Sequence, residues 1–282
     1  MNAALKKNID EILKLAFKED STKKDITSSL LLSNKKISAV IKFKEKGILC
    51  GKNIINYIFS KFDKKIIIKW VKNEGQQISK NEIICKVSGP GNSIVSIERI
   101  ILNFLQRLSG IATLTNKYVE IINNNKIKIL DTRKTIPGWR LLEKYAVKTG
   151  GGTNHRNNLS DAILVKDTHI KINGSVTLVL EKLIKKRSAK EIEIEISTLK
   201  ELKEAIKFSP GTIMLDNFLL SEIKKCINII RSSSKSKIEI SGNIDESKLR
   251  KMKNYDIDYV SIGKLTHSAK FLDISMTILN KD

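Results

Sequence analysis

The second half of the chain alternates short apolar runs with amphipathic helical patterns, and this alternation restricts the fold more than any other feature. The apolar runs have strand length and are expected at 127–130, 162–165, 192–196, 212–215, 238–240 and 259–262. Helical patterns lie between them, near 138–149, 175–187, 198–208, 218–231 and 245–254. Continuous apolar strands that alternate with helices indicate a parallel sheet buried on both faces. Several such units in series predict a (β/α) barrel, complete or incomplete, with a doubly wound open sheet as the alternative.

The first part of the chain has a different pattern. Residues 3–18 carry apolar side chains at helical spacing, and a second amphipathic helix is expected over 94–114. Between them, 36–43 and 65–71 have the composition of strands, and the glycines at 75, 89 and 91 mark turns. This mixture predicts a separate α/β segment before the barrel.

Polar residues follow the strands of the second half one after another. Barrel enzymes place their active sites at this carboxyl edge of the sheet. The residue types sort into cations, carboxylates and small loop residues, which favours an enzyme that acts on an anionic, phosphorylated substrate over a binding module. In strand order, the residues are Thr132, Arg133 and Lys134, then Lys166, Glu195, Asp216, the run Ser241, Gly242 and Asn243, and finally Gly263.

The formal net charge of +22 raises the alternative of a basic nucleic-acid-binding protein. The excess is mostly lysine and is spread along the whole chain rather than gathered in one patch. Aromatic residues make up only 5% of the chain, so stacking platforms for bases are scarce. We therefore interpret the charge as a compositional drift and expect no specific nucleic-acid partner.

The three cysteines, Cys50, Cys85 and Cys226, are scattered and form no metal-binding pair. We expect reduced, packed thiols. Every apolar stretch is far shorter than the ~20 residues of a membrane span. Charges recur through the first residues and leave no room for a signal-peptide core. These features predict a cytoplasmic protein without a membrane partner.

The densest run of functional residue types is 131–156 (DTRKTIPGWRLLEKYAVKTGGGTNHR), which continues into 163–170 (ILVKDTHI). In these two segments, the sequence closely resembles the quinolinate phosphoribosyltransferase family, whose members are also called carboxylating nicotinate-nucleotide pyrophosphorylases. The resemblance covers nearly the whole chain, and a long ordered match is far more specific than a lone glycine motif. The other matching segments are 98–99 (ER), 102–113 (LNFLQRLSGIAT), 193–195 (EIE), 214–217 (MLDN), 239–243 (EISGN) and 261–268 (SIGKLTHS).

The resemblance implies an N-terminal α/β sandwich domain over 1–112, packed with an incomplete (β/α) barrel over 113–268. It implies that the tail, 269–282, returns to the first domain. It also implies a homodimer in which each subunit completes the active site of the other. Two positions depart from the common family pattern, since Thr168 stands where Asn is common and Asn243 where Gly is frequent. These departures concern the details of the loops.

Quinolinate is a pyridine with two adjacent carboxylates, which needs convergent cations, and arginine can bond both oxygens of a planar carboxylate. Arg133, Arg156 and Lys166 are the expected cations, and the resemblance implies that Arg99 reaches the pocket of the partner subunit. Thr132 and His155 are expected to add hydrogen bonds. Lys134 is a candidate for the quinolinate or the pyrophosphate side, and we place it with Lys166, Glu195 and Asp216 among the catalytic candidates.

The second substrate, phosphoribosyl pyrophosphate, brings Mg²⁺, which prefers one or two carboxylates together with water and substrate oxygens. Glu195 and Asp216 suit this role, or hydrogen bonds to the ribose hydroxyls. Ser241, Gly242 and Asn243 come before an expected helix and, with Gly263, fit a site for the 5′-phosphate. Glu193 shares a strand face with Glu195, and its role stays open.

The activity that the resemblance implies is that of a pentosyltransferase in NAD biosynthesis. Quinolinate and phosphoribosyl pyrophosphate give nicotinate mononucleotide, pyrophosphate and carbon dioxide. Two further alternatives are a protein of the same fold with another acceptor and a homologue that has lost its activity. The complete set of arginines and lysines argues against the first, and the intact strand-end residues argue against the second.

Overall fold

The computed structural model describes residues 1–33 and 35–279, which form two compact units. Unit 1 combines Met1–Asn116, Thr135–Gly151 and Lys264–Asp282, and unit 2 combines Lys117–Lys134 and Gly152–Gly263. The division expected at residues 112 and 113 stays a prediction, and helix α4 (Gly91–Ile122) runs through it. No helix of the described residues is both long and apolar enough to cross a membrane.

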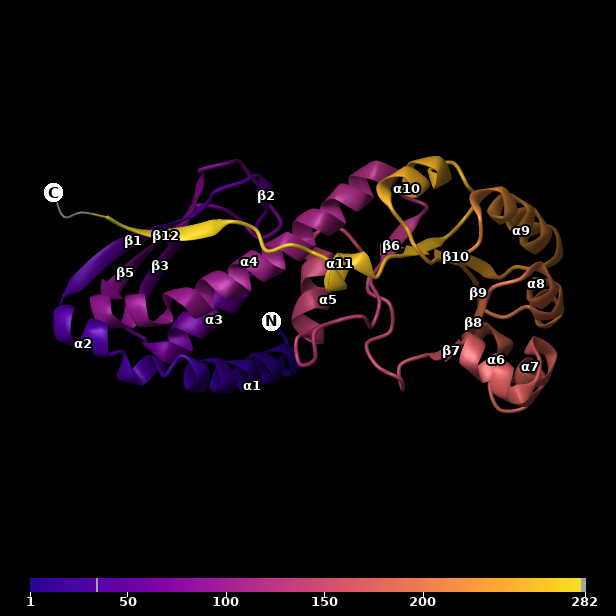
Figure 1. The fold of residues 1–282 in the computed structure, drawn as a ribbon, viewed down its shortest axis with the longest axis horizontal. Coiled ribbons are helices and arrows are strands. Elements are labelled where there is room, and N and C mark those ends of the chain that lie inside the picture. The colour runs from indigo at the N-terminus through magenta and orange to yellow at the C-terminus, as the bar shows by residue number, and fades with distance from the viewer. Residues whose placement is uncertain (34, 280–282) are drawn as a thin grey trace. The chain divides into compact units, whose positions relative to one another are not determined.

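Unit 1 is built on a four-stranded antiparallel sheet with the order β12-β1-β5-β3. Ala39, Ile41 and Phe43 are alternate residues of β1 and are fully buried, in keeping with the two-residue period of a strand. Figure 1 shows helices on one side of this sheet. The strands are β1 (Lys36–Phe43), β3 (Ile67–Trp70), β5 (Ile83–Pro90) and β12 (Ile274–Leu279).

The remaining elements of unit 1 are short, apart from α1 (Ala3–Glu19), α3 (Lys52–Phe62) and α5 (Arg140–Thr149). Arg107 on α4 connects three segments of unit 1 by hydrogen bonds. Its Nε donates to Glu143 on α5 at 3.0 Å, and its Nη1 donates to the Ala269 carbonyl in the tail at 3.0 Å. The tail therefore has a fixed anchor before β12 pairs with β1. The short elements are α2 (Ile26–Leu31), β2 (Gly47–Ile48), β4 (Gln77–Ile78) and α11 (Lys264–His267).

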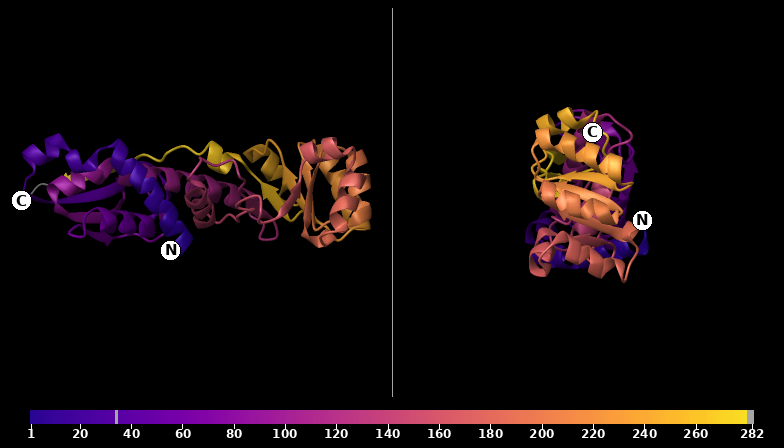
Figure 2. Two further views of the ribbon diagram at one scale, coloured as in Figure 1. Left: turned by 90° about the horizontal axis from the view of Figure 1, so that it is seen from below. Right: turned by 90° about the vertical axis from the view of Figure 1, so that its right-hand side faces the viewer.

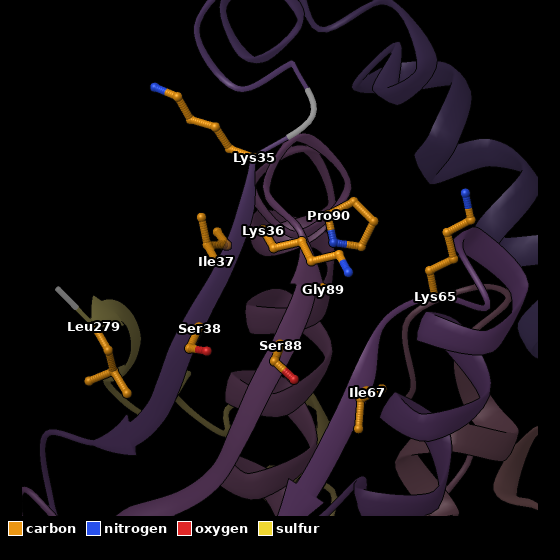
Figure 3. A pocket seen from close by; sticks show the side chains of 10 residues that line it. All are labelled: Lys35, Lys36, Ile37, Ser38, Lys65, Ile67, Ser88, Gly89, Pro90 and Leu279. Atoms are coloured by element: carbon orange, nitrogen blue, oxygen red, sulfur yellow. The ribbon is translucent and has the colours of Figure 1, made fainter. Parts of the chain in front are cut away.

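The opposite face of the unit 1 sheet carries a row of side chains that includes Ser38, Ser88 and Ile67 on neighbouring strands. Figure 3 shows this row in a pocket whose rim also carries lysines. Ile67 is 58% exposed and Leu279, in register with Ser38, is 42% exposed. Within unit 1 this face is therefore open, apolar at its edges and positively charged at its rim.

Unit 2 contains one sheet of six parallel strands in the order β6-β11-β10-β9-β8-β7. The strands follow the chain order from β7 to β11, and the first strand, β6, lies beside the last. This is the order of a barrel that is open between β6 and β7. A doubly wound sheet reverses its order in the middle, so that alternative is wrong and the incomplete (β/α) barrel is confirmed. The strands are β6 (Lys128–Leu130), β7 (Ile163–Val165), β8 (Ile192–Ile196), β9 (Thr212–Asp216), β10 (Lys237–Ser241) and β11 (Tyr259–Ser261).

Helices cover one face of the unit 2 sheet, as Figures 1 and 2 show for α6 to α9. Along β8, Ile192, Ile194 and Ile196 are buried, while Glu193 and Glu195 alternate with them and are half-buried. The inner face therefore carries polar groups, and the expectation of two apolar faces holds only in part. The helices are α6 (Asp167–Asn173), α7 (Val176–Ile184), α8 (Leu199–Ala205), α9 (Leu220–Ser233) and α10 (Glu246–Met252).

The six strands predicted for the second half are confirmed, each within one residue of its expected ends. The helix predicted over 94–114 is longer than expected and covers Gly91–Ile122, because Tyr118 and Ile122 continue its buried stripe. Helices α3 and α6 were not predicted. Apolar residues of α3 recur at helical spacing, with Ile54, Ile55, Ile58 and Phe59 buried.

Candidate active site

The topology of unit 2 brings most of the predicted site residues to one edge of the sheet. Because all six strands are parallel, their carboxyl ends meet there. Asp216 and Ser241 end β9 and β10 and are paired in register. Lys166 directly follows β7, and Glu195 is the penultimate residue of β8. Arg99 is an exposed residue of α4 in unit 1.

The carboxylates of Glu195 and Asp216 act on one another. Burial raises the pKa of Glu195 above its usual value, and the negative charge of Asp216 raises it further. The ammonium group of Lys166 opposes this effect. The two carboxylates supply oxygen ligands of the kind that Mg²⁺ prefers. The donor set therefore fits the predicted magnesium site.

Arg133 and Arg156 form a second electrostatic group. Burial lowers the pKa of the Arg156 guanidinium, and the positive charge of Arg133 lowers it further. Glu193 and Asp161 partly offset this repulsion. The Arg156 Nη1 donates to the Ala162 carbonyl at 3.1 Å, which directs the side chain. Two cations held near each other against their repulsion favour a dianionic ligand.

His155 has protein partners at both ring nitrogens. Its Nδ1 accepts the backbone N–H of Arg156 at 2.9 Å, and its Nε2 lies 3.2 Å from Glu193 Oε1. Because Nδ1 is an acceptor, the proton of the neutral ring sits on Nε2 and is donated to Glu193. A substrate that bonds this ring has to displace one of these partners. The predicted substrate contact of His155 stays a prediction.

His155, Glu193 and Glu239 form one group whose ligand atoms lie within 4.8 Å of one another. A metal at Nε2 would move the ring proton to Nδ1, where it would face the Arg156 N–H. The tautomer therefore favours a hydrogen-bonded cluster over a metal site. Burial raises the pKa of Glu239 to about 8, and the charge of Glu193 adds to this effect. Glu239 is 1% exposed, so its neutral form is the stable one near neutral pH.

The predicted phosphate loop turns sharply at Gly242 and Asn243, which have φ values of 87° and 48°. The expected contribution of a helix dipole is weak, because α10 has only 7 residues and Asp245 already caps it by accepting from the Lys248 N–H at 2.7 Å. Lys248 also donates from Nζ to the Gly242 carbonyl at 3.1 Å. The loop therefore depends on its own backbone and on Lys248 rather than on the helix end.

The loop after β6 is shaped by the hydroxyl group of Thr132. The Lys134 N–H donates to Thr132 Oγ1 at 3.1 Å, and the Asp131 carboxylate before it accepts the His155 N–H at 2.9 Å. The backbones of the segments that carry Arg133 and Arg156 are thereby tied together. The roles predicted for Thr132, Lys134 and Gly263 remain predictions.

Sequence reasoning did not select four residues of this region. Glu239 lies in a segment that resembles the family, and nothing in the sequence indicates that it is buried beside another glutamate. Lys248 had no distinguishing signal in a lysine-rich chain. Glu193 had a weak signal, because it shares a strand face with Glu195. Asn217 follows Asp216 at a strand end and lies in a segment that resembles the family, but neither signal assigns it a role.

Comparison with known proteins gives a consistent picture. Residues 25–109 match the family described as the N-terminal domain of quinolinate phosphoribosyl transferase, and residues 111–277 match its C-terminal domain. A probable carboxylating nicotinate-nucleotide pyrophosphorylase from Bacillus subtilis is 40% identical, with 96% of this chain and 93% of that protein covered. A mitochondrial decarboxylating quinolinate phosphoribosyltransferase from Nicotiana tabacum is 35% identical, with 96% and 82% covered.

Solved structures agree with these sequence matches. The structure of the nicotinate-nucleotide pyrophosphorylase from Francisella tularensis superimposes with a TM-score of 0.90 at 38% identity, and 97% of each chain is covered. Both units described above therefore have counterparts in a single known protein.

Proposed function

The chain belongs to the quinolinate phosphoribosyltransferase family, and from this premise we propose that it works as a decarboxylating pentosyltransferase at the carboxyl ends of the unit 2 strands. Its substrates are quinolinate and phosphoribosyl pyrophosphate. Its products are nicotinate mononucleotide, pyrophosphate and carbon dioxide, in the biosynthesis of NAD. The predicted family and fold class are confirmed by the matches over both units.

The observation that carries the proposed site is that one edge of the sheet holds both a pair of arginines and a pair of carboxylates. Arg156 is partly desolvated and is repelled by the nearby charge of Arg133, so a ligand with two carboxylates relieves this repulsion. Glu195 and Asp216 repel each other on neighbouring strands and suit a ligand that brings a cation or hydroxyl donors. Quinolinate and phosphoribosyl pyrophosphate have these complementary groups.

The residues position the two substrates for a displacement at ribose C1. Arg133, Arg156 and Lys166 hold the carboxylates of quinolinate, so that the ring nitrogen faces C1. Glu195 and Asp216 would hold Mg²⁺, which supplies charge neutralisation for the departing pyrophosphate when it is bound. The Ser241–Asn243 loop and Gly263 hold the 5′-phosphate. The bond from C1 to the pyrophosphate oxygen breaks as the bond to the ring nitrogen forms.

Loss of carbon dioxide follows from the charge of the new ring. Once the nitrogen carries the ribose, the ring is positive and stabilises an electron pair at the adjacent carbon. The bond to the C2 carboxylate then breaks, its electron pair stays at C2, and a proton adds there. Arg133 and Arg156 hold the carboxylates on binding, and water exclusion around them strengthens this hold.

A homodimer is part of the proposal. Arg99 is exposed on α4, and the open sheet face of unit 1 presents Ile67, Leu279 and a lysine rim to solvent (Figure 3). An exposed face of this kind is suited to cover by a second copy of the chain. In such a dimer, Arg99 of the partner subunit would add a third arginine to the quinolinate pocket.

We also place the enzyme in the cytoplasm. All three cysteines are free and buried, and burial raises the pKa of Cys85 to about 12 and that of Cys226 to about 11. Such thiols are protonated and unreactive, which suits a reducing compartment.

The site is tested by replacing one arginine of the cation pair and one arginine elsewhere. R133A should lower kcat/KM for quinolinate by about 100-fold or more, because it removes one partner of a desolvated charge contact. R187A changes an exposed arginine after α7 and serves as the control, which should keep wild-type turnover. Steady-state kinetics with varied quinolinate measures both. Equal kcat/KM values for R133A and the wild type would contradict the assignment of the cation site.

A further inference from the structure

Two neighbouring strand ends of unit 2 meet at the side chain of Asn217, directly after β9. Its Nδ2 donates to Asp216 Oδ2 at 2.7 Å. Its Oδ1 accepts from Asn243 Nδ2 at 3.3 Å, in the loop after β10. One amide therefore contacts both the candidate metal-binding carboxylate and the candidate phosphate loop.

The hydrogen bond to Asp216 fixes how this carboxylate is presented. An amide donor occupies Oδ2 without adding charge, so the other oxygen remains for a cation or a ribose hydroxyl. The donor also offsets part of the repulsion between Asp216 and Glu195, whose charges act on each other. The orientation of Asp216 thus depends on its neighbour in the chain.

The contact with the loop is held by the backbone as well as by the side chain. The Asn217 N–H donates to the Ser241 carbonyl at 3.1 Å. Asn217 has a φ of 58°, a left-handed conformation that asparagine tolerates better than most residues. A Cβ atom at residue 242 would lie 2.6 Å from the backbone nitrogen of Asn217, so only glycine permits this close approach. Residues 217 and 242 are therefore packed together in one arrangement.

We propose that Asn217 is a positioning residue for phosphoribosyl pyrophosphate, which aligns the Asp216 carboxylate with the Ser241–Asn243 loop. The inference rests on the proposed function, because it assigns these two elements to opposite ends of one substrate. The 5′-phosphate binds the loop, and the ribose hydroxyls or the metal of the pyrophosphate end meet Asp216. A rigid link between the elements sets their separation, so that C1 is presented in one position to the ring nitrogen.

The expected cations for quinolinate are carried by other segments: Arg133 follows β6, Arg156 precedes β7 and Lys166 follows β7. The hydrogen bonds of Asn217 go to Asp216, Asn243 and the Ser241 carbonyl, at the ends of β9 and β10. A change at Asn217 should therefore affect one substrate and spare the other. This selectivity separates a positioning role from a general role in folding.

Two substitutions isolate the amide from the backbone. N217D keeps the size and the tolerance for positive φ, but it replaces the N–H donor with a charge beside Asp216. N217G keeps the positive φ and removes the side chain. N123D and N123G are matched controls, because Asn123 also has a positive φ, of 38°, and lies at the end of α4, before the amino end of β6.

Turnover of the wild type is measured first with quinolinate, phosphoribosyl pyrophosphate and MgCl₂, because its absence would defeat the proposed function itself. With an active wild type, N217D and N217G should each raise KM for phosphoribosyl pyrophosphate by about 10- to 100-fold, as expected for a lost hydrogen bond to a charged group. KM for quinolinate and the melting temperature should stay near the wild-type values. Calorimetric titration with phosphoribosyl pyrophosphate and MgCl₂ should show the same loss of affinity, and the Asn123 variants should show none.

The proposal is overturned if both Asn217 variants keep the wild-type KM for phosphoribosyl pyrophosphate. It is also overturned if both substrates lose affinity equally, since this would indicate a general distortion of unit 2. Failure of N217G to fold leaves the test to N217D. Failure of both to fold would assign Asn217 to the stability of the fold and would equally contradict the proposal.

Discussion

Glu239 lies in an environment that disfavours its ionised form. Its side chain is 1% exposed, its Oε1 has no hydrogen-bond partner among the described residues, and Glu193 lies beside it. The other groups that act on it are His155 and the Ser261 hydroxyl, which lower its pKa, and Glu195, which raises it. A buried acid that keeps its proton limits the negative charge beneath a site that has to bind anions.

This environment predicts how stability depends on pH. The folded protein holds the Glu239 proton up to about pH 8, whereas the unfolded chain loses it near the usual carboxyl pKa of about 4.5. Folding therefore binds a proton between these values, and the stability contribution falls as pH rises from about 5 to about 8. E239Q removes the titration, so the unfolding free energy of the wild type minus that of E239Q should fall across this window and level off above it. Urea unfolding at several pH values measures the difference, and a difference that rises with pH would contradict this account.

Much of the site, but not all of it, could be predicted at the residue scale. The strand-end residues are visible in the sequence because an apolar run marks each strand and the next residues carry charge. Glu239 and Asn217 are different, since their roles depend on neighbours 46 and 26 residues away, Glu193 and Asn243. A single sequence gives no sign of such pairs, because spacing along the chain does not report which strands become neighbours.

At the scale of elements, Arg231 at the end of α9 holds the amino ends of two strands. Its Nε donates to Asp256 at 2.9 Å and its Nη2 donates to Asp258 at 2.9 Å. Asp258 in turn accepts the backbone N–H of Ile238 at 2.9 Å. The amino ends lie at the edge opposite the candidate active site, where barrel residues serve stability rather than catalysis.

R231A should therefore lower stability and leave the kinetics unchanged. We expect a loss of about 1–3 kcal/mol in the unfolding free energy, because hydrogen bonds to charged groups are lost and Asp258 loses a partner. Chemical denaturation measures this loss, and KM for both substrates serves as the functional readout. A tenfold change in either KM without a loss of stability would show that the two edges of the sheet are not independent.

The elements themselves could be predicted to different degrees. The barrel strands were predicted within one residue because isoleucine-rich runs between helical patterns have few other interpretations. β12 was not predicted as a strand, because its antiparallel partner, β1, lies more than 200 residues earlier in the chain. α6 was missed because its 7 residues are too few for a helical period to stand out.

At the scale of the whole molecule, the proposed homodimer makes a prediction that a monomer cannot satisfy. If Arg99 serves the pocket of the partner subunit, R99A and R133A each inactivate sites built from two chains. A mixed dimer then has one site with both changes and one intact site. Mixing the two inactive proteins after reversible dissociation should restore about a quarter of the wild-type activity, because half of the dimers are mixed. No recovery in a mixture shown to exchange subunits would contradict shared sites.

The most direct test of the central claim follows carbon dioxide and nicotinate mononucleotide together. Wild-type protein is given phosphoribosyl pyrophosphate, MgCl₂ and quinolinate labelled with ¹³C in the carboxylate at C2. The proposed function predicts one labelled carbon dioxide for each nicotinate mononucleotide formed, with no carbon dioxide when phosphoribosyl pyrophosphate is omitted. A folded protein that forms neither product, or that forms a ribosylated acid with its label retained, would contradict the proposed reaction.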